Sequence, residues 1–169
     1  QAQLHITLHR LAHQLVENHL DFSESVIIGM QPRGVLFSDR ILELLASITN
    51  NQKIQYGRLD ITFYRDDLDK QDALQAPSET DIAFSVTNKR VILVDDVLHT
   101  GRTIRAAMDA LLDFGRPKEV ELMTLIDRRF SRELPIQPDY VGLSVDTLFE
   151  QKVIVNWKAK EGNDEVVLL

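Results

Sequence analysis

Two kinds of apolar pattern alternate along the first two-thirds of the chain. One kind is a short, mostly apolar run, which is typical of a strand buried on both faces of a sheet. Such runs occupy residues 25–30, 90–94 and 120–126. The other kind is the amphipathic spacing of three or four positions, which predicts helices at residues 4–16, 35–48 and 103–114. Strands that alternate with helices indicate an α/β fold with a mostly parallel central sheet flanked by helices.

The other segments add short strands and one long polar stretch. Residues 54–64 are rich in β-branched and aromatic side chains and predict a further strand. Short strand candidates follow at residues 140–145, 153–157 and 166–169. The polar stretch from Arg65 to about residue 88 has no clear period. Loops of this length are uncommon inside compact domains, so the stretch is either a surface excursion or a lid, and we expect a lid.

The segment VILVDDVLHTGRT, residues 91–103, organises the rest of the chain. Four apolar residues run into Asp95 and Asp96, and a short polar turn then leads into a helix. Ligands of open α/β sheets bind beyond the carboxyl ends of the strands, where these acids are expected. The turn from Thr100 to Thr103 offers consecutive amides, hydroxyls and a helix N-terminus, which together suit a phosphate. Two acids tolerate a phosphate nearby if they meet ribose hydroxyls or a cation, so the loop predicts a ligand with a ribose, a phosphate and Mg²⁺.

Other interpretations of this segment explain less. The motif GxxxxGK[ST] of P-loop hydrolases and the motif GxGxxG of dinucleotide folds are both absent. The acid cluster of a receiver domain usually opens a chain, whereas this pair lies in mid-sequence. A core strand that merely ends in solvated acids leaves the two threonines and the glycine of the same turn unexplained.

A second loop follows the first predicted strand. Pro32, Arg33 and Gly34 lie where the strand ends and a helix begins. Helix N-termini attract anions because their first amides lack partners, and Arg33 adds a positive charge. The alternative is a plain turn.

Composition limits the protein class. The chain has 169 residues and no Cys, which suits a single domain over residues 1–169 without a disulfide framework. No apolar run approaches the roughly 20 residues that span a bilayer, so we expect a cytoplasmic protein. The net charge of −7 argues against general affinity for nucleic acid, although a local basic face stays possible.

Three histidines, His5, His9 and His13, lie four residues apart on the first predicted helix. They could form a metal pair or a strip that contacts anions, but such a spacing more commonly marks a solvated helix edge.

The central segment resembles the phosphoribosyl pyrophosphate (PRPP) motif of type I phosphoribosyltransferases. Three further segments resemble one branch of that family, the bifunctional pyrimidine operon attenuation regulators with uracil phosphoribosyltransferase activity. They are DITFYRDDL at residues 60–68, RELPI at residues 132–136 and DYVG at residues 139–142. Together with Arg33-Gly34-Val35, the matches cover nearly the whole chain.

The resemblance implies that uracil and PRPP react to uridine monophosphate (UMP) and pyrophosphate. Asp95 and Asp96 would hold the ribose hydroxyls, and Mg²⁺ would be bound mainly through PRPP. The phosphate would be bound by Val97, Leu98, Thr100, Gly101, Arg102 and Thr103. Pro32, Arg33 and Gly34 would bind pyrophosphate, with a cis peptide bond between Pro32 and Arg33.

The resemblance also assigns the surroundings of the reacting atoms. Arg65, Asp66 and Asp67 would begin a mobile hood that closes over the site, and backbone groups near Lys152 and Val153 would bind the base. His99 would either take the proton from the ring nitrogen of uracil or only line the loop.

No protein ligand for the metal is expected. Lys158 lies where the superfamily often has a metal-binding acid, and Glu161 or Asp164 could replace that acid.

Two rival functions remain open at this stage. One is an RNA-binding attenuator with little catalysis, for which His13 and Arg132 match positions that RNA-binding relatives use. Asn18, Gln137 and Leu143 lie where those relatives tend to be basic, which weakens an interaction with an mRNA leader. The other is a phosphoribosyltransferase for another base, such as orotate or a purine. By resemblance the chain also forms a homodimer or a higher homo-oligomer.

Overall fold

The fold is built on a five-stranded parallel sheet. The computed structural model describes residues 2–50, 53–66, 78–148 and 151–169. The strands are β1 (Ser25–Met30), β2 (Gln55–Leu59), β3 (Arg90–Leu98), β4 (Glu119–Arg129) and β5 (Tyr140–Asp146). They lie in the order β2-β1-β3-β4-β5 and every neighbouring pair is parallel. The predicted α/β fold with a mostly parallel sheet is therefore confirmed.

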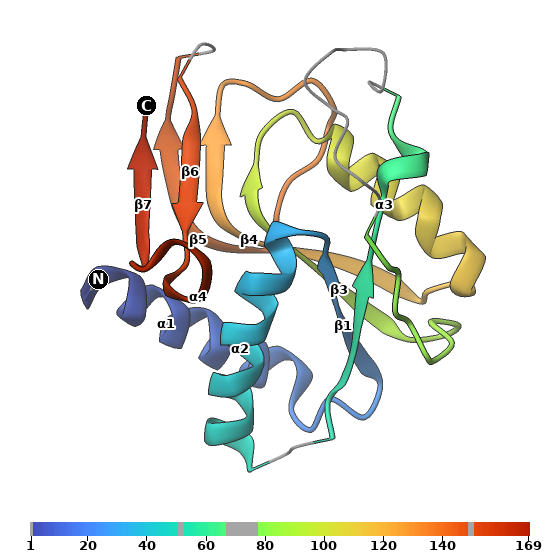
Figure 1. Cartoon of the computed structure of the whole chain (residues 1–169). Coiled ribbons are helices and arrows are strands. Elements are labelled where there is room, and N and C mark those ends of the chain that lie inside the picture. The colour runs from blue at the N-terminus through green and yellow to red at the C-terminus, as the bar shows by residue number, and fades with distance from the viewer. Residues whose placement is uncertain (1, 51–52, 67–77, 149–150) are drawn as a thin grey trace.

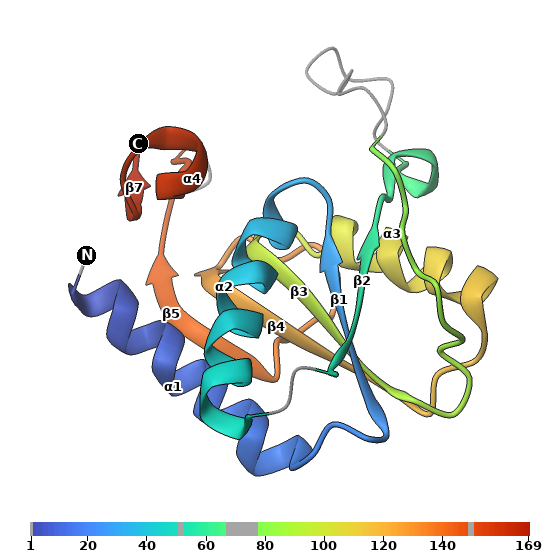
Figure 2. The same cartoon turned by 60° about the horizontal axis from the view of Figure 1, so that its bottom comes forward.

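Helices cover both faces of the sheet (Figures 1 and 2). Helices α1 (Ala2–His19) and α2 (Arg33–Thr49) pack on one face, and α3 (Arg102–Leu111) packs on the other. The central strand β3 contributes to both cores because successive side chains of a strand point to opposite faces. Ile92 and Val94 pack with α1 and α2, whereas Val91 and Leu93 pack with α3.

A small antiparallel hairpin follows the sheet. It consists of β6 (Val153–Asn156) and β7 (Glu165–Leu168), with the short helix α4 (Lys158–Glu161) between them. Trp157, which is 2% exposed, anchors the hairpin to α2 because its ring stacks on that of Phe37 with the centroids 6.1 Å apart. The hairpin thus lies next to β5, outside the five-stranded sheet (Figure 1).

Three elements differ from the sequence prediction. β3 continues to Leu98 instead of stopping at Val94, and β4 continues to Arg129 instead of stopping at Ile126. The extension of β3 pairs with β4, as in Asp95 with Thr124 and Leu98 with Asp127. This pairing overrides the low strand propensity of aspartate. The predicted strand 54–64 ends at Leu59, and a 3₁₀ turn (Thr62–Tyr64) follows.

A buried polar network closes the end of the sheet where the strands begin. His19 lies 3.0 Å from both the Glu121 carboxylate and the Tyr140 hydroxyl, and that hydroxyl donates to Glu121 at 2.7 Å. Burial is the largest effect on His19 and lowers its pKa, against the opposing effect of Glu121. The network joins the end of α1 to β4 and β5.

None of the described helices has the length and apolarity that crossing a bilayer requires.

Candidate functional site

The two acids of the central segment point to opposite faces of β3. Because the strand continues through them, Asp95 follows Val91 and Leu93 to the α3 face, whereas Asp96 follows Ile92 and Val94 to the α2 face. Asp95 lines a cavity of about 350 Å³, and Asp96 does not. The sequence predicted a loop that presents both acids together, and the extension of the strand separates them.

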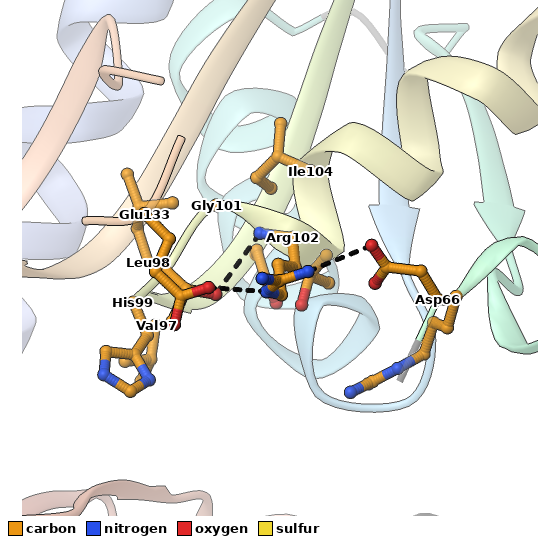
Figure 3. A pocket seen from close by; sticks show the side chains of 12 residues that line it. Asp66, Val97, Leu98, His99, Gly101, Arg102, Ile104 and Glu133 are labelled. Atoms are coloured by element: carbon orange, nitrogen blue, oxygen red, sulfur yellow. Dashed lines mark hydrogen bonds and ion pairs between the residues drawn. The ribbon is translucent and has the colours of Figure 1, made fainter. Parts of the chain in front are cut away.

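The cavity lies at the carboxyl end of β3, where the sequence predicted the ligand (Figure 3). Most of its wall comes from residues 97–104, which run from the end of β3 through the turn into the start of α3. Its lining residues are Arg65, Asp66, Asp95, Val97, Leu98, His99, Thr100, Gly101, Arg102, Thr103, Ile104 and Glu133. The structure thus brings together Asp95, the predicted phosphate-binding residues and the beginning of the expected hood. Asp67 lies outside the described residues.

The turn is shaped to begin a helix. Gly101 has a φ of 91°, a left-handed conformation that favours glycine, and α3 starts at the next residue. The backbone amide of Arg102 donates to the Thr100 hydroxyl at 3.3 Å, and the Gly101 carbonyl accepts from the amide of Arg105 at 3.0 Å. The first turn of a helix leaves amides without backbone partners, and these suit an anion.

The segment after β4 supports this turn. The amides of Glu133 and Leu134 donate to the Thr100 carbonyl at 3.0 and 3.1 Å. The guanidinium of Arg132 donates to the His99 carbonyl and pairs with Asp127. RELPI, residues 132–136, was predicted only to be part of a resemblance, and the structure shows that this segment holds the turn in shape.

Arg102 crosses the cavity between two carboxylates (Figure 3). Its Nε lies 2.6 Å from Glu133, and its Nη1 lies 3.0 Å from Asp66. Asp66 also pairs with Arg105 at 3.0 Å. All of these side chains are partly exposed, so the ion pairs are worth little in water. An arriving phosphate can therefore replace the carboxylates on Arg102 at small cost.

The acids of β3 are in an unfavourable environment without a ligand. Burial and the neighbouring Asp96 raise the pKa of Asp95, and only weaker effects, including the charge of Arg65, oppose them. Burial also raises the pKa of Asp96, against the opposing hydrogen bond from Arg33. Buried carboxylates with raised pKa values gain most from a ligand that donates hydrogen bonds or carries positive charge.

The surroundings of His99 favour the neutral form of its imidazole. Burial is the largest effect that lowers its pKa below 6.5, and the positive charges of Arg128 and Arg132 lower it further. Glu133 opposes these effects. The neutral imidazole has a ring nitrogen that can accept a proton.

The loop between β1 and α2 lies on the face of β3 opposite to the cavity, where Asp96 points. A Cβ atom on Gly34 would come within 2.3 Å of the Val94 carbonyl oxygen, so glycine allows α2 to begin directly against β3. Arg33 donates through Nε to Asp96 at 3.0 Å and through a second nitrogen to the Val155 carbonyl. Pro32, Arg33 and Gly34 do not line the cavity.

The cis peptide bond in this loop is not where we expected it. It lies between Gln31 and Pro32, one position before the expected bond between Pro32 and Arg33. The prediction was therefore wrong by one residue. Before a proline the nitrogen is tertiary, and the cis form costs much less there than before any other residue.

The predicted base-binding residues lie in the hairpin. Both backbone groups of Lys152 bond to Leu169 at 2.8 Å, and Val153 pairs with Leu168. The preceding segment is held by Arg128, which is 5% exposed and which the sequence analysis gave no role. Its guanidinium donates to the Thr147 hydroxyl at 3.0 Å and the Gln151 carbonyl at 2.7 Å. The only signal for it in the sequence was its place among three arginines within residues 128–132.

Comparison with known proteins identifies the family. The model of the phosphoribosyl transferase domain matches residues 1–159. The chain belongs to the phosphoribosyltransferase family. Proteins named "Bifunctional protein PyrR" are similar to it over most of its length. The one from Desulfosudis oleivorans is 47% identical, covering 98% of this chain and 91% of its own. The one from Halalkalibacterium halodurans is 43% identical, covering 94% of this chain and 88% of its own.

Solved structures agree with this fold. A hypoxanthine-guanine phosphoribosyltransferase from Bacillus anthracis is 18% identical, with a TM-score of 0.70 over 98% of this chain and 93% of that one. The hypoxanthine phosphoribosyltransferase of Trypanosoma cruzi is 16% identical, with a TM-score of 0.72 over 99% of this chain and 92% of that one. The chain therefore has the phosphoribosyltransferase fold and belongs to the PyrR branch of the family.

The described residues offer few groups that could hold a metal ion. Within the described ranges there is no cluster of three or more His, Cys, Asp or Glu side chains that could hold a metal ion. Asp164, a candidate metal ligand, pairs with Arg40 at 3.2 Å and accepts from the Lys158 amide at 2.8 Å. The side chain of Glu161 is outside the described set. Of the three carboxylates that line the cavity, Asp66 and Glu133 pair with Arg102, so Asp95 is the one that best fits a divalent cation such as Mg²⁺.

Proposed function

We propose that this phosphoribosyltransferase transfers the phosphoribosyl group of PRPP to uracil and releases pyrophosphate. The observation that carries the proposal is the cavity of about 350 Å³ that the partly buried Asp95 lines together with the turn at the start of α3. This combination suits a sugar phosphate. The choice of uracil rests on the resemblance of residues 60–68, 132–136 and 139–142 to regulators with uracil phosphoribosyltransferase activity, and relatives named "Bifunctional protein PyrR" agree with that branch.

Each part of the site has a role in this reaction. The turn from Thr100 to Thr103 and the α3 N-terminus bind the 5-phosphate. Arg102 gives up its ion pair with Glu133 and binds this phosphate instead. Asp95 accepts hydrogen bonds from the ribose hydroxyls, which relieves the cost of its burial. Mg²⁺, when bound, neutralises the pyrophosphate oxygens.

The loop before α2 serves the leaving group. The bond between the anomeric carbon and pyrophosphate breaks, and pyrophosphate leaves with the electron pair. Arg33 would contact this group. Before pyrophosphate arrives, Asp96 holds the Arg33 guanidinium at the start of α2. The positive charge that develops on the sugar makes water a competing nucleophile, so a hood that begins at Arg65, Asp66 and Asp67 would exclude it.

His99 is placed for proton transfer. A bond forms between the anomeric carbon and the ring nitrogen of uracil, which gives up its proton. His99 lines the cavity and its lowered pKa keeps the imidazole neutral, so it accepts that proton. The uracil ring would lie between this side chain and the segment that Arg128 holds in front of Lys152 and Val153.

A regulatory role is a second candidate. Phe130 is 84% exposed beyond the end of β4, and the Arg129 guanidinium lies 5.6 Å from its ring centroid. Exposed aromatic rings next to arginine stack on unpaired RNA bases. The net charge of −7 opposes this role. A gel-shift titration with pyrimidine leader RNA tests it, and an affinity equal to that for a scrambled RNA would exclude it.

The enzymatic proposal is tested by pyrophosphate release. With PRPP and Mg²⁺, release should depend on added uracil in the wild type and fall at least tenfold in Asp95→Asn. Asp109→Asn on the exposed surface of α3 is the matched control and should keep wild-type rates. Release that does not depend on uracil would contradict the proposal.

A further inference from the structure

The amino-terminal half of α1 carries a histidine pair that the proposed reaction does not use. His5 and His9 lie one helical turn apart, and their Nε2 atoms are 3.1 Å apart. Their ring centroids are separated by 4.3 Å with the planes tilted by 49°, so the two nitrogens converge while the rings diverge. His5 is exposed and His9 is partly exposed, so an ion from solvent can reach both.

We propose that His5 and His9 form a binding site for a late first-row divalent transition metal, of the class of Ni²⁺, Cu²⁺ and Zn²⁺. Metal–imidazole bonds are about 2.0–2.1 Å long, so two nitrogens 3.1 Å apart would bind one ion at an angle of about 100°. This angle falls between the 90° of square or octahedral sites and the 109° of tetrahedral ones. The side chains are thus already arranged as two adjacent ligands of one ion.

The surroundings define a site with two protein ligands. His5 lines a cavity of about 290 Å³ together with Asp164, but the two oxygens of Asp164 bond to Arg40 and to the Lys158 amide. In the part of the chain that the structure describes, no third His, Cys, Asp or Glu side chain completes a cluster. Water would fill the remaining positions, and the affinity would be moderate.

The donor atoms set the selectivity. Neutral imidazole favours Ni²⁺, Cu²⁺ and Zn²⁺ over Mg²⁺, which prefers oxygen ligands. The pair is therefore distinct from the Mg²⁺ that would act at Asp95. An ion held by residues i and i+4 also fixes the first turns of α1, whose Leu8 and Leu11 are buried in the core. Binding should consequently stabilise the fold.

The test is a titration of the untagged, metal-free protein with NiCl₂ and ZnCl₂, followed by calorimetry and thermal unfolding. The wild type should bind one ion per chain and melt at a higher temperature with the metal. His5→Gln and His9→Gln should each weaken binding at least tenfold and abolish the shift. His13→Gln is the matched control, since His13 is also exposed on α1 but is not part of the pair, and it should behave as the wild type.

Two results would overturn the proposal. One is wild-type affinity in the double variant His5→Gln/His9→Gln, which would place the ion elsewhere, for example at His99. The other is a wild type that binds no more tightly than the single variants, which would show that the pair does not chelate. Circular dichroism and uracil-dependent turnover without added Ni²⁺ or Zn²⁺ confirm that each variant is folded.

Discussion

Replacing Asp95 with asparagine should stabilise the ligand-free protein while it abolishes activity. Asparagine has the shape of a protonated aspartate and removes the buried charge. The pKa of Asp95 is raised in the folded protein, chiefly by burial and by Asp96. The folded state therefore binds this proton more tightly than the unfolded state, in which the pKa is near 3.8.

The sign of the pH dependence follows from this difference. Below pH 3.8 the carboxyl is protonated in both states and contributes nothing. As the pH rises through the window up to the raised folded pKa, the wild type loses stability, and above that pKa the full cost is present. Each unit of upward shift costs about 1.4 kcal/mol. For a chain of this length, about 1.4 kcal/mol corresponds to a change in melting temperature of roughly 3–6 °C.

The assay is thermal unfolding of the wild type and Asp95→Asn at several pH values from 4 to 9 without ligand. The variant should melt several degrees higher at pH 8, and the difference should shrink as the pH falls toward 4. Other groups titrate in both proteins, so the difference isolates Asp95 and its coupling to Asp96. A variant that melts lower than the wild type at pH 8, or a gain independent of pH, would refute the reasoning.

Three further substitutions test other parts of the account. Gly34→Ala should cost on the order of 1–3 kcal/mol of unfolding free energy in urea, because its Cβ would meet the Val94 carbonyl oxygen at 2.3 Å; an unchanged midpoint would contradict the packing of α2. His99→Phe should lower kcat and remove the acid limb of the pH–rate profile, which in the wild type should lie below pH 6.5 because the pKa is lowered; an unchanged rate and profile would exclude the base role. Tyr140→Phe should cost about 1–3 kcal/mol, measured in urea, because Glu121 loses a buried donor. Its kcat should stay within a factor of two, since this network lies at the other end of the strands, and a large loss of kcat would show coupling to the site.

The sequence predicts the layers of this fold well because their signals are local. The apolar run 25–30 is β1 with the same bounds, and the periodicity of 35–48 lies within α2. The place of the ligand loop is also correct, since a buried strand that runs into polar residues and a helix start defines its own carboxyl end. The turn from Thr100 to Thr103 accordingly lines the cavity.

Features that depend on distant partners are not predictable in the same way. The separation of Asp95 and Asp96 follows from the pairing of the extension of β3 with β4, about 30 residues further along the chain. The same holds for Arg128, whose partners Thr147 and Gln151 come from the connection between β5 and β6. Ion pairs such as Arg102 with Glu133 depend on a tertiary contact, which leaves no periodic pattern in the sequence.

The central claim is that this chain makes UMP from uracil. The most direct measurement is chromatographic separation of the nucleotides that form when the protein is incubated with PRPP, Mg²⁺ and equal amounts of uracil, orotate and hypoxanthine. The account predicts that UMP accumulates from uracil, with the products of the other two bases at least a hundredfold slower. A faster product from hypoxanthine or orotate, or no UMP at all, would contradict it.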